Sequence, residues 1–236
     1  MTGNGFLDML SPEDTERLAP YLRRVFLAAG SLLVEQGFDV ETVHFPIDAQ
    51  ITNILTQGDG SAIEVSVVGA EGVTGLLPFI AHAASAWRTV VRLPGDAWMI
   101  SASTLRLLAD QSATLRHALI SLGYYYQVQG VYNGACAATH PISARVARWV
   151  LTAADLAGAR EIRFTQEEMA SLLAVQRTSV VEAFGSLKSA GSIRHLRGKI
   201  LILDRGSLTR QSCSCYGALK QQAVELGVLP KSLVVG

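Results

Sequence analysis

Short runs of apolar and β-branched residues, separated by glycines, fill the sequence from about residue 25 to residue 100. Such runs at regular spacing are typical of the strands of a small sandwich or roll. A Ser-Pro-Glu-Asp sequence at 11–14 precedes Leu18 and Leu22 and predicts a short leading helix, with serine at the cap. We expect an N-terminal β domain with strands at 31–35, 50–56, 61–68, 87–93 and 97–101.

After Ser101 the apolar spacing changes to three and four residues, the period of a helix. With Ser103 as its cap, a long helix is expected to begin there, and a heptad-like stripe along it is typical of helices that pair with a second copy. Gly130 and Gly134 would let two helices approach closely, or would serve equally in packing against the β domain. We expect a homodimer whose seam contains Leu115, Leu119, Leu122, Tyr126, Gln129, Asn133 and Cys136.

Part of this predicted helix, residues 118–139, holds no charged residue over a length that could span a bilayer. Gln127, Gln129 and Asn133 dilute its apolar character, and no cluster of lysine or arginine flanks it. We therefore expect a buried helix and no membrane partner.

The helical pattern is interrupted at His140-Pro141, because the residue before a proline is pushed out of the α region. The next helix is expected to end near Gly158, a suitable C′ residue. Thr165 and Glu168 have the spacing of a capping box for another helix. We expect three parts, with a β domain at 1–110, a dimerisation helix at 111–139 and a second domain at 140–236.

The segment 166–191 has the pattern of two crossed helices joined by a turn at Ala174-Val175, with Ala170 small where the helices should touch. Downstream, 192–196 and 199–203 alternate like two short strands and predict a β-hairpin. Together they predict a winged helix-turn-helix. The apolar positions of its two helices are Met169, Leu173, Val180, Phe184 and Leu187.

Charge is divided unevenly along a chain that is neutral as a whole. Residues 1–139 hold 7 Lys and Arg against 13 Asp and Glu, a net charge of −6, and residues 140–236 hold 13 against 7, a net charge of +6. A basic half indicates a polyanionic partner, with chance segregation as the alternative. Three cysteines make no disulfide framework and no signal-peptide pattern opens the chain, so we expect a cytoplasmic protein.

The whole layout, from about residue 6 to residue 216, resembles the Crp/Fnr superfamily of bacterial transcription regulators. The resemblance rests on Gly30 and Gly37, on Val-Gly-Ala-Glu-Gly at 68–72, on Arg-Val-Ala-Arg-Trp at 145–149, and on the segments 173–180 and 191–204. The chain also resembles a subgroup that ends in Cys-x-Cys-Tyr, here at 213–216. The resemblance implies an α+β protein with a cyclic-nucleotide-binding-like β-roll, a dimerisation helix and a C-terminal winged helix-turn-helix. It also implies a homodimer that binds palindromic double-stranded DNA through the major groove, with RNA polymerase as a further partner.

Site residues follow from this resemblance. Arg177 could read a guanine through two hydrogen bonds, whereas Glu182 stands where other branches have arginine and could accept from a cytosine amino group. Ala174 replaces the glycine usual in the turn, which predicts a non-glycine residue at positive φ. The family's base-reading positions are Arg177, Thr178, Val181 and Glu182. The candidates for phosphate contacts are Thr165, Ser179, Arg197 and Lys199.

The family's cofactors are not expected in this sequence. Val73 stands where a cyclic-nucleotide pocket needs a glutamate, Ser85-Ala86 falls near the required arginine-serine pair, and Arg88 is the nearest cation. The N-terminal domain has no cysteine for an iron-sulfur cluster, and its histidines are scattered, which leaves haem unsupported. Cys213 and Cys215 have poor spacing for a disulfide and make half a zinc site, so we expect no cofactor or metal and interpret them as structural or redox-sensitive.

Catalysis is not expected, because the sequence has no HxH metal pair, no GxSxG elbow and no GxxxxGK[ST] phosphate loop. Two alternatives to a DNA-reading regulator are left open. Glu182 and the atypical turn would suit a winged-helix module that binds a protein or a small molecule without reading DNA. The β domain would suit a true cyclic-nucleotide sensor. The effector itself is not indicated by any motif.

Overall fold

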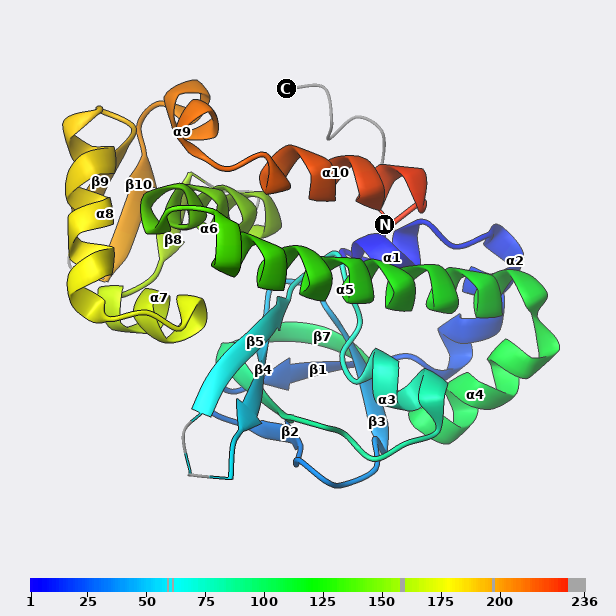
Figure 1. The fold of residues 1–236 in the computed structure, drawn as a ribbon. Coiled ribbons are helices and arrows are strands. Elements are labelled where there is room, and N and C mark those ends of the chain that lie inside the picture. Colours follow the sequence, from blue (N-terminus) through cyan, green and yellow to red (C-terminus); the bar gives the residue numbers. More distant parts are fainter. Residues whose placement is uncertain (59, 61, 158–159, 197, 229–236) are drawn as a thin grey trace. The chain divides into compact units, whose positions relative to one another are not determined.

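The computed structural model describes residues 1–58, 60, 62–157, 160–196 and 198–228 (Figure 1). Its contacts divide the chain into two compact units, Met1–Gln127 with Gln222–Gly236, and Val128–Gln221. This division differs from the expected domains, since the first unit includes residues 111–127 of the helix that was expected to mediate dimerisation, and the end of the last helix. Ala223 and Val228 are buried in the core of the first unit.

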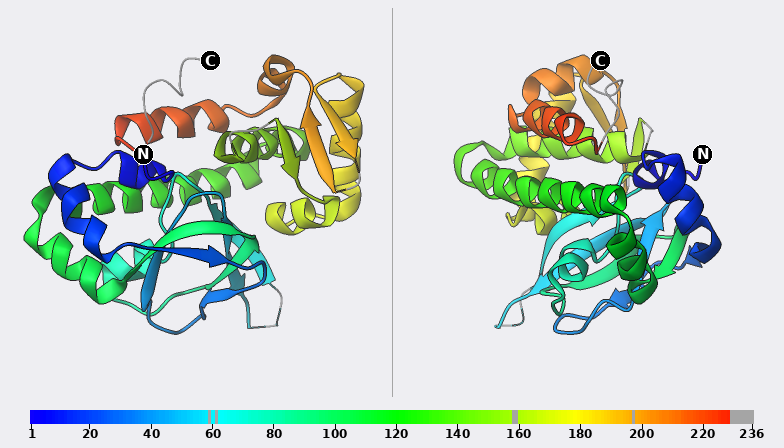
Figure 2. Two further views of the ribbon diagram at one scale, coloured as in Figure 1. Left: turned by 180° about the vertical axis from the view of Figure 1, so that it is seen from behind. Right: turned by 90° about the vertical axis from the view of Figure 1, so that its right-hand side faces the viewer.

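The strands of the first unit form two antiparallel sheets that curve into a roll (Figure 2). All five strands expected from the sequence are confirmed to within a few residues. Two further strands were missed, because one is mostly exposed and lacks an apolar alternation, and the other ends in Pro46. One sheet has the order β1 (Arg23–Leu27), β7 (Gly95–Ser101), β3 (Thr42–Pro46), and the other has the order β2 (Leu32–Val34), β6 (Arg88–Leu93), β4 (Gln50–Thr56), β5 (Ala62–Val68).

Helices close the ends of this roll. Ser11 caps the expected leading helix by accepting a hydrogen bond from Asp14 N at 3.1 Å. The cap of the helix after β7 is Ser101, whose Oγ accepts from Thr104 N at 3.1 Å, and the expectation of Ser103 was wrong. The helical elements of the first unit are α1 (Gly5–Asp8), α2 (Pro12–Leu18), η1 (Ala19–Tyr21), α3 (Leu76–Ala81), α4 (Ala102–Gln111) and the first half of α5 (Ala113–Thr139).

The helical pattern that starts after Ser101 makes two helices and not one. Ser112 has an extended backbone, and its Oγ accepts from Leu115 N at 3.2 Å to begin α5. The same hydroxyl and that of Thr114 donate to the carboxylate of Asp14 at 2.5 and 2.6 Å. This polar junction holds α2 against the break between α4 and α5.

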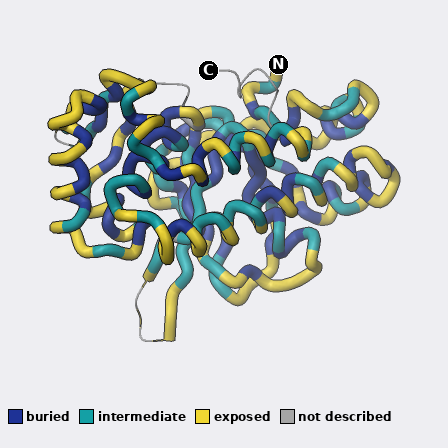
Figure 3. Tube along the Cα trace, turned by 45° about the horizontal axis from the view of Figure 1, so that its top comes forward, coloured by how far each residue is buried: buried dark blue, intermediate teal, exposed yellow. Residues whose placement is uncertain are grey.

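The predicted dimer seam faces the interior of the chain itself. Leu115, Leu119 and Leu122 are at most 2% exposed and pack in the core of the first unit. Cys136 is fully buried, and Tyr126 Oη accepts from Val73 N at 2.9 Å. The three leucines and Cys136 are therefore buried within a single chain and are not free to form the predicted seam, whereas Gln129 and Asn133 are half-buried. The exposed positions of α5 include a set at alternating spacings of three and four, which we call the outer stripe: His117, Ile120, Tyr124, Gln127, Val131, Gly134 and Ala138. Figure 3 shows how exposed and buried residues alternate along the helical segments of the chain.

Neither α5 nor any other helix in the described part of the chain combines the length and apolar character that crossing a bilayer requires. The apolar residues of α5 are divided between its buried side and the outer stripe. The residues of the uncharged stretch at 118–139 therefore lie on both the buried and the exposed side of the helix.

His44 on β3 predicts an acid-sensitive first unit. Its side chain is 4% exposed, and burial lowers the pKa of the imidazole to about 4 from 6.5. The folded chain thus keeps His44 neutral, while the unfolded chain takes up a proton below pH 6.5. Lowering the pH from 6.5 to 4 should therefore reduce the free energy of unfolding by roughly 3 kcal/mol. Urea unfolding of the wild type and of His44→Leu across this range would measure it, and the same pH dependence in both chains would contradict it.

The second unit is a helical domain with a small antiparallel sheet of order β8-β10-β9. Its helices surround a core that includes Val150, Met169 and Phe184. The short strand β8 was not predicted, since three residues give too little alternation. Gly158, the expected end of the second helix, and Arg197 lie outside the described residues. The elements are α6 (Ile142–Ala157), β8 (Glu161–Arg163), α7 (Gln166–Leu173), α8 (Arg177–Ser189), β9 (Ile193–Leu196), β10 (Lys199–Ile202), α9 (Arg205–Gln211) and α10 (Cys215–Glu225), which continues into the first unit.

Candidate functional site

The helix pair α7 and α8 carries the candidate DNA-binding surface, and α7 begins with a complete capping box. Thr165 Oγ1 accepts from Glu168 N at 3.1 Å, while Glu168 Oε2 accepts from Thr165 N at 2.6 Å. The sequence prediction of this box is confirmed. It satisfies two backbone donors at the start of α7 and so fixes where the pair begins.

The turn between α7 and α8 is held from both sides. Ala174 has φ 50°, which confirms the prediction of a non-glycine residue at positive φ. Val175 N donates to Ala170 O at 3.0 Å and closes the turn. Arg145 on α6 is 8% exposed, and its Nη2 donates to Leu173 O at 2.7 Å. Because the last carbonyls of a helix lack partners within it, this buried cation stabilises the end of α7 and ties it to α6.

One face of α8 is buried and the opposite face is free. Val180, Ala183, Phe184 and Leu187 pack in the core of the unit. Residues three and four positions apart on a helix share a face. The helix α8 lies beside the hairpin of β9 and β10 (Figure 1). The four predicted base-reading residues, Arg177, Thr178, Val181 and Glu182, are all exposed.

Arg177 extends into solvent from the first turn of α8. Its side chain is 65% exposed, and its Nε lies 3.9 Å from Glu167 Oε2, whose side chain is 77% exposed. An ion pair of this length between exposed groups is weak and screened by salt. The guanidinium is therefore free to exchange this partner for another acceptor, such as a base edge.

The wing sheet brings basic side chains onto one face. Residues directly opposite each other on paired strands point to the same side, and Lys199 lies opposite Arg163, while Leu201 lies opposite Arg194. Arg163 and Arg194 are exposed and were not among the predicted phosphate contacts, because β8 was not predicted and their alignment depends on the register of the strands. We call Arg163, Arg194 and Lys199 the wing cations.

The predicted phosphate contacts are partly engaged within the chain. Lys199 Nζ lies 2.7 Å from Glu161 Oε1, and this hydrogen bond and charge hold the pKa of Glu161 below its usual value. The hydroxyl of Thr165 belongs to the capping box, and Ser179 is half-buried at the first turn of α8. A phosphate group would therefore compete with Glu161 for Lys199.

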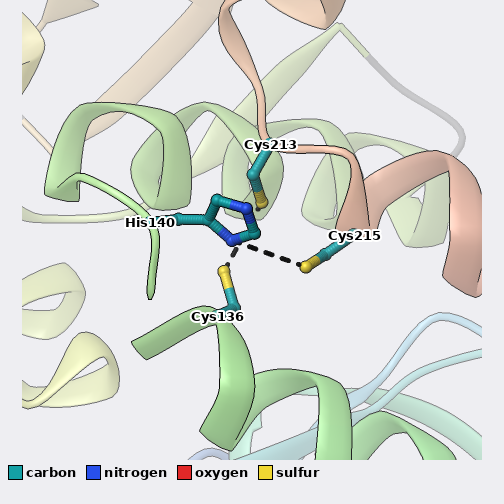
Figure 4. A group of neighbouring side chains, drawn as sticks. All are labelled: Cys136, His140, Cys213 and Cys215. Atoms are coloured by element: carbon teal, nitrogen blue, oxygen red, sulfur yellow. Dashed lines mark hydrogen bonds between the residues drawn. The ribbon is translucent and has the colours of Figure 1, made fainter. Parts of the chain in front are cut away.

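A second constellation in the same unit joins all three cysteines with a histidine. Cys136 and His140 lie at the end of α5, Cys213 precedes α10, and Cys215 begins it (Figure 4). The cysteines are free thiols and buried, and burial raises the pKa of Cys136 to about 12. Cys213 and Cys215, which alone would make half a zinc site, thus lie beside two further potential ligands, Cys136 and His140, and the four side chains form a group that could hold a metal ion.

Tyr216 anchors the chain beside these thiols. Its Oη donates to Asp155 Oδ2 on α6 at 2.7 Å and accepts from Arg205 Nη2 on α9 at 2.6 Å. Arg205 also pairs with Asp155. Burial and the hydrogen bond to Asp155 raise the pKa of Tyr216, so the phenol stays protonated. The tyrosine of the Cys-x-Cys-Tyr motif thus has a structural role that fixes the start of α10.

The residues that correspond to a cyclic-nucleotide cassette are buried or already bonded to other residues of the first unit. Val73 is buried, and its N–H donates to Tyr126 Oη. Ser85 is buried and donates to Trp87 O at 2.7 Å. Arg88 Nε lies 2.9 Å from Glu35 Oε1. The described residues of this segment therefore present no free cation paired with a carboxylate for a ribose.

The sequence and the fold were compared with known protein families, curated sequences and solved structures. Residues 144–211 match the Crp-like helix-turn-helix domain. A comparison with curated protein sequences finds no match. Among solved structures, the chain is similar to FixK2 of Bradyrhizobium japonicum, with TM-score 0.73 and 13% identity over 82% of this chain and 98% of that one. It is also similar to a chain of Eubacterium rectale assigned to the Crp/Fnr family, with TM-score 0.67 and 17% identity over 89% and 99%. A CRP-family transcriptional regulator of Thermus thermophilus gives TM-score 0.65 and 18% identity over 80% and 96%.

Proposed function

We propose that this chain, which carries a Crp-like helix-turn-helix domain at residues 144–211 and has the fold of the Crp/Fnr regulators, is a sequence-specific DNA-binding transcription regulator. In this proposal α8 enters the major groove. The observation that carries it is the exposed face of α8, with the exposed side chain of Arg177 at its first turn, on a helix pair that a capping box and Arg145 hold in place.

Each group has a distinct task in the proposed complex. Arg177 reads a guanine through two hydrogen bonds, and Glu182, which repels phosphate, reads a cytosine amino group. Thr178 and Val181 complete the base-reading face. The wing cations and Ser179 contact phosphates and set the orientation of the domain, without reading sequence themselves.

The proposed regulator is a homodimer that pairs through the outer stripe of α5. Ile120, Tyr124 and Val131 are large apolar side chains left exposed on this stripe. Their spacing is that of the a and d positions of a coiled coil, and a Cβ built at Gly134 meets no atom within 4 Å, so a second helix can approach there. A two-fold dimer places its recognition helices about 34 Å apart, which matches a palindromic site with half-sites one helical turn apart.

Replacing Lys199 with alanine tests the wing in this proposal. Loss of one phosphate contact should weaken binding to specific and random duplexes alike, and should reduce the slope of log affinity against log salt by about 1. Fluorescence anisotropy at several salt concentrations measures both quantities. Arg23→Ala removes an exposed cation from the first unit and should leave the slope unchanged. An unchanged slope for Lys199→Ala would contradict a wing contact.

A further inference from the structure

We propose that Cys136, His140, Cys213 and Cys215 form a structural zinc site in the second unit. The ligand atoms of all four residues lie within 4.8 Å of one another. The side chains come from two segments far apart in the sequence and converge on one point (Figure 4). Such convergence of three thiols and an imidazole is the donor set that zinc prefers in structural sites.

The distances suit one tetrahedral ion. Cys136 Sγ lies 3.4 Å from Cys213 Sγ, and Cys215 Sγ lies 3.7 Å from His140 Nδ1. With bonds of about 2.3 Å to sulfur and about 2.1 Å to nitrogen, the ligand atoms of a tetrahedral zinc site are roughly 3.5 to 3.8 Å apart. These two distances match those of a tetrahedral site within a few tenths of an ångström, and the remaining pairs, all within 4.8 Å, need to close by at most about 1 Å to enclose the ion. The four atoms also lie too close together to enclose an iron-sulfur cluster.

The spacing of the ligands along the chain allows all four to bind at once. Cys136 lies in the last turn of α5 and His140 directly follows the helix, where His140 N still donates to Cys136 O at 3.1 Å, so the two residues keep the spacing of one helical turn. Cys213 precedes α10 and Cys215 begins it, in a segment that Tyr216 fastens to α6 and α9. The protein thus supplies four ligands and leaves no open position, which favours a structural ion over a catalytic one.

Arg148 supports this assignment through its charge. Three thiolates, a neutral imidazole and Zn²⁺ carry a net charge of −1, which is costly to bury without a counterion. Arg148 is 6% exposed, and its charge acts on both Cys136 and Cys215. Its Nη2 donates to Asn133 Oδ1 at 2.9 Å, while its Nε is buried without a hydrogen-bond partner in the described part of the chain. The negative charge of a zinc-thiolate centre would balance the positive charge of the buried Arg148 guanidinium.

The proposed ion fastens the end of α5 to the segment between α9 and α10. Because Pro141 follows directly, the ion holds the start of α6, the helix whose Arg145 positions the end of α7. Ligands brought together by folding bind zinc more tightly in the folded chain than in the unfolded chain, so the ion stabilises the second unit.

Metal analysis of the full-length chain tests the site. The wild type, dialysed without chelator, is expected to retain one zinc ion per chain, measured by inductively coupled plasma mass spectrometry. Replacement of zinc by Co²⁺ should give the intense visible bands of tetrahedral cobalt and a thiolate-to-cobalt charge-transfer band. Cys213→Ser and His140→Ala should each lower the zinc affinity by roughly 100-fold or more, since even residues that support ligands change it by 10- to 100-fold. Ser214→Ala, which changes the residue between two of the ligands, is a control that should retain the ion.

Four results would overturn the proposal. These are a folded wild type without zinc after incubation with excess Zn²⁺, a six-coordinate cobalt spectrum, iron in place of zinc, or wild-type affinity in both ligand variants. If a ligand variant does not fold, the test is made on the wild type instead, by removing its zinc. A chelator should then lower the melting temperature of the wild type, and Zn²⁺ should restore it. An unchanged melting temperature in chelator, with zinc removed, would contradict a structural ion.

Discussion

The double variant Tyr124→Glu/Val131→Glu is expected to sediment as a monomer and to lose roughly 1,000-fold or more in affinity for a two-half-site operator. Both residues lie on the outer stripe of α5, with 57% and 60% of their surface exposed. In a dimer that pairs through this stripe, the substitutions bring four carboxylates together in an apolar seam, which costs several kcal/mol. A monomer binds one half-site at a time, so it loses the gain in affinity that two connected DNA-binding domains have on a site with two halves.

The fold of the double variant should be unchanged, because neither side chain packs in a core. Circular dichroism and the melting temperature check this. Leu107→Glu is the matched control, since Leu107 on α4 is 57% exposed and lies outside α5. This control should remain dimeric. A double variant that sediments with the mass of a dimer would contradict pairing through the outer stripe.

Arg177→Ala is expected to reduce affinity for the preferred duplex by roughly 5- to 150-fold and to relax preference at one base pair of each half-site. The reason is that a bidentate contact to guanine carries sequence information, which a phosphate contact does not. Binding of wild type and variant to a set of single-base-pair substitutions measures the change. Lys188→Ala removes another exposed cation of α8, at its last turn, and should retain the preference. Equal losses on specific and random duplexes for Arg177→Ala would rule out base reading by this residue.

Local signals in the sequence predicted the elements of the second unit well. The capping box of Thr165 and Glu168 and the positive φ of Ala174 both depend on residues close together in the chain. The strand β8 was missed for the opposite reason. Its three residues are too short to show an alternation, and their pairing with β10 is set by residues far along the chain. The contribution of Arg163 to the wing therefore became visible in the structure alone.

The seam of α5 shows a different limit of sequence analysis. The helix α5 has apolar residues on two sides. The helical spacing of these residues in the sequence shows that apolar stripes exist, but it does not show which stripe packs in the core of the first unit. Leu115, Leu119 and Leu122 are covered by the core of the chain, which leaves Ile120 and Tyr124 outside. Leucines were a poor guide because a core uses them as readily as a dimer seam does.

The thiol cluster depends on long-range proximity that spacing cannot reveal. Cys213 and Cys215 are half of a ligand set, and their partners lie more than 70 residues earlier in the chain. Cys136 was assigned to the dimer seam by its helical spacing, and the same spacing places it four residues before His140. The fold of the second unit brings these two pairs together.

Selection of randomised duplexes by the full-length protein at near-physiological salt tests the central claim most directly. The retained sequences should contain a palindrome with half-sites about 10 base pairs apart, centre to centre. The same motif should appear with and without cyclic AMP, because Val73 stands where a cyclic-nucleotide pocket needs a glutamate. Retention of duplexes without any common motif would contradict a sequence-specific regulator and would leave a basic domain that binds the DNA backbone alone.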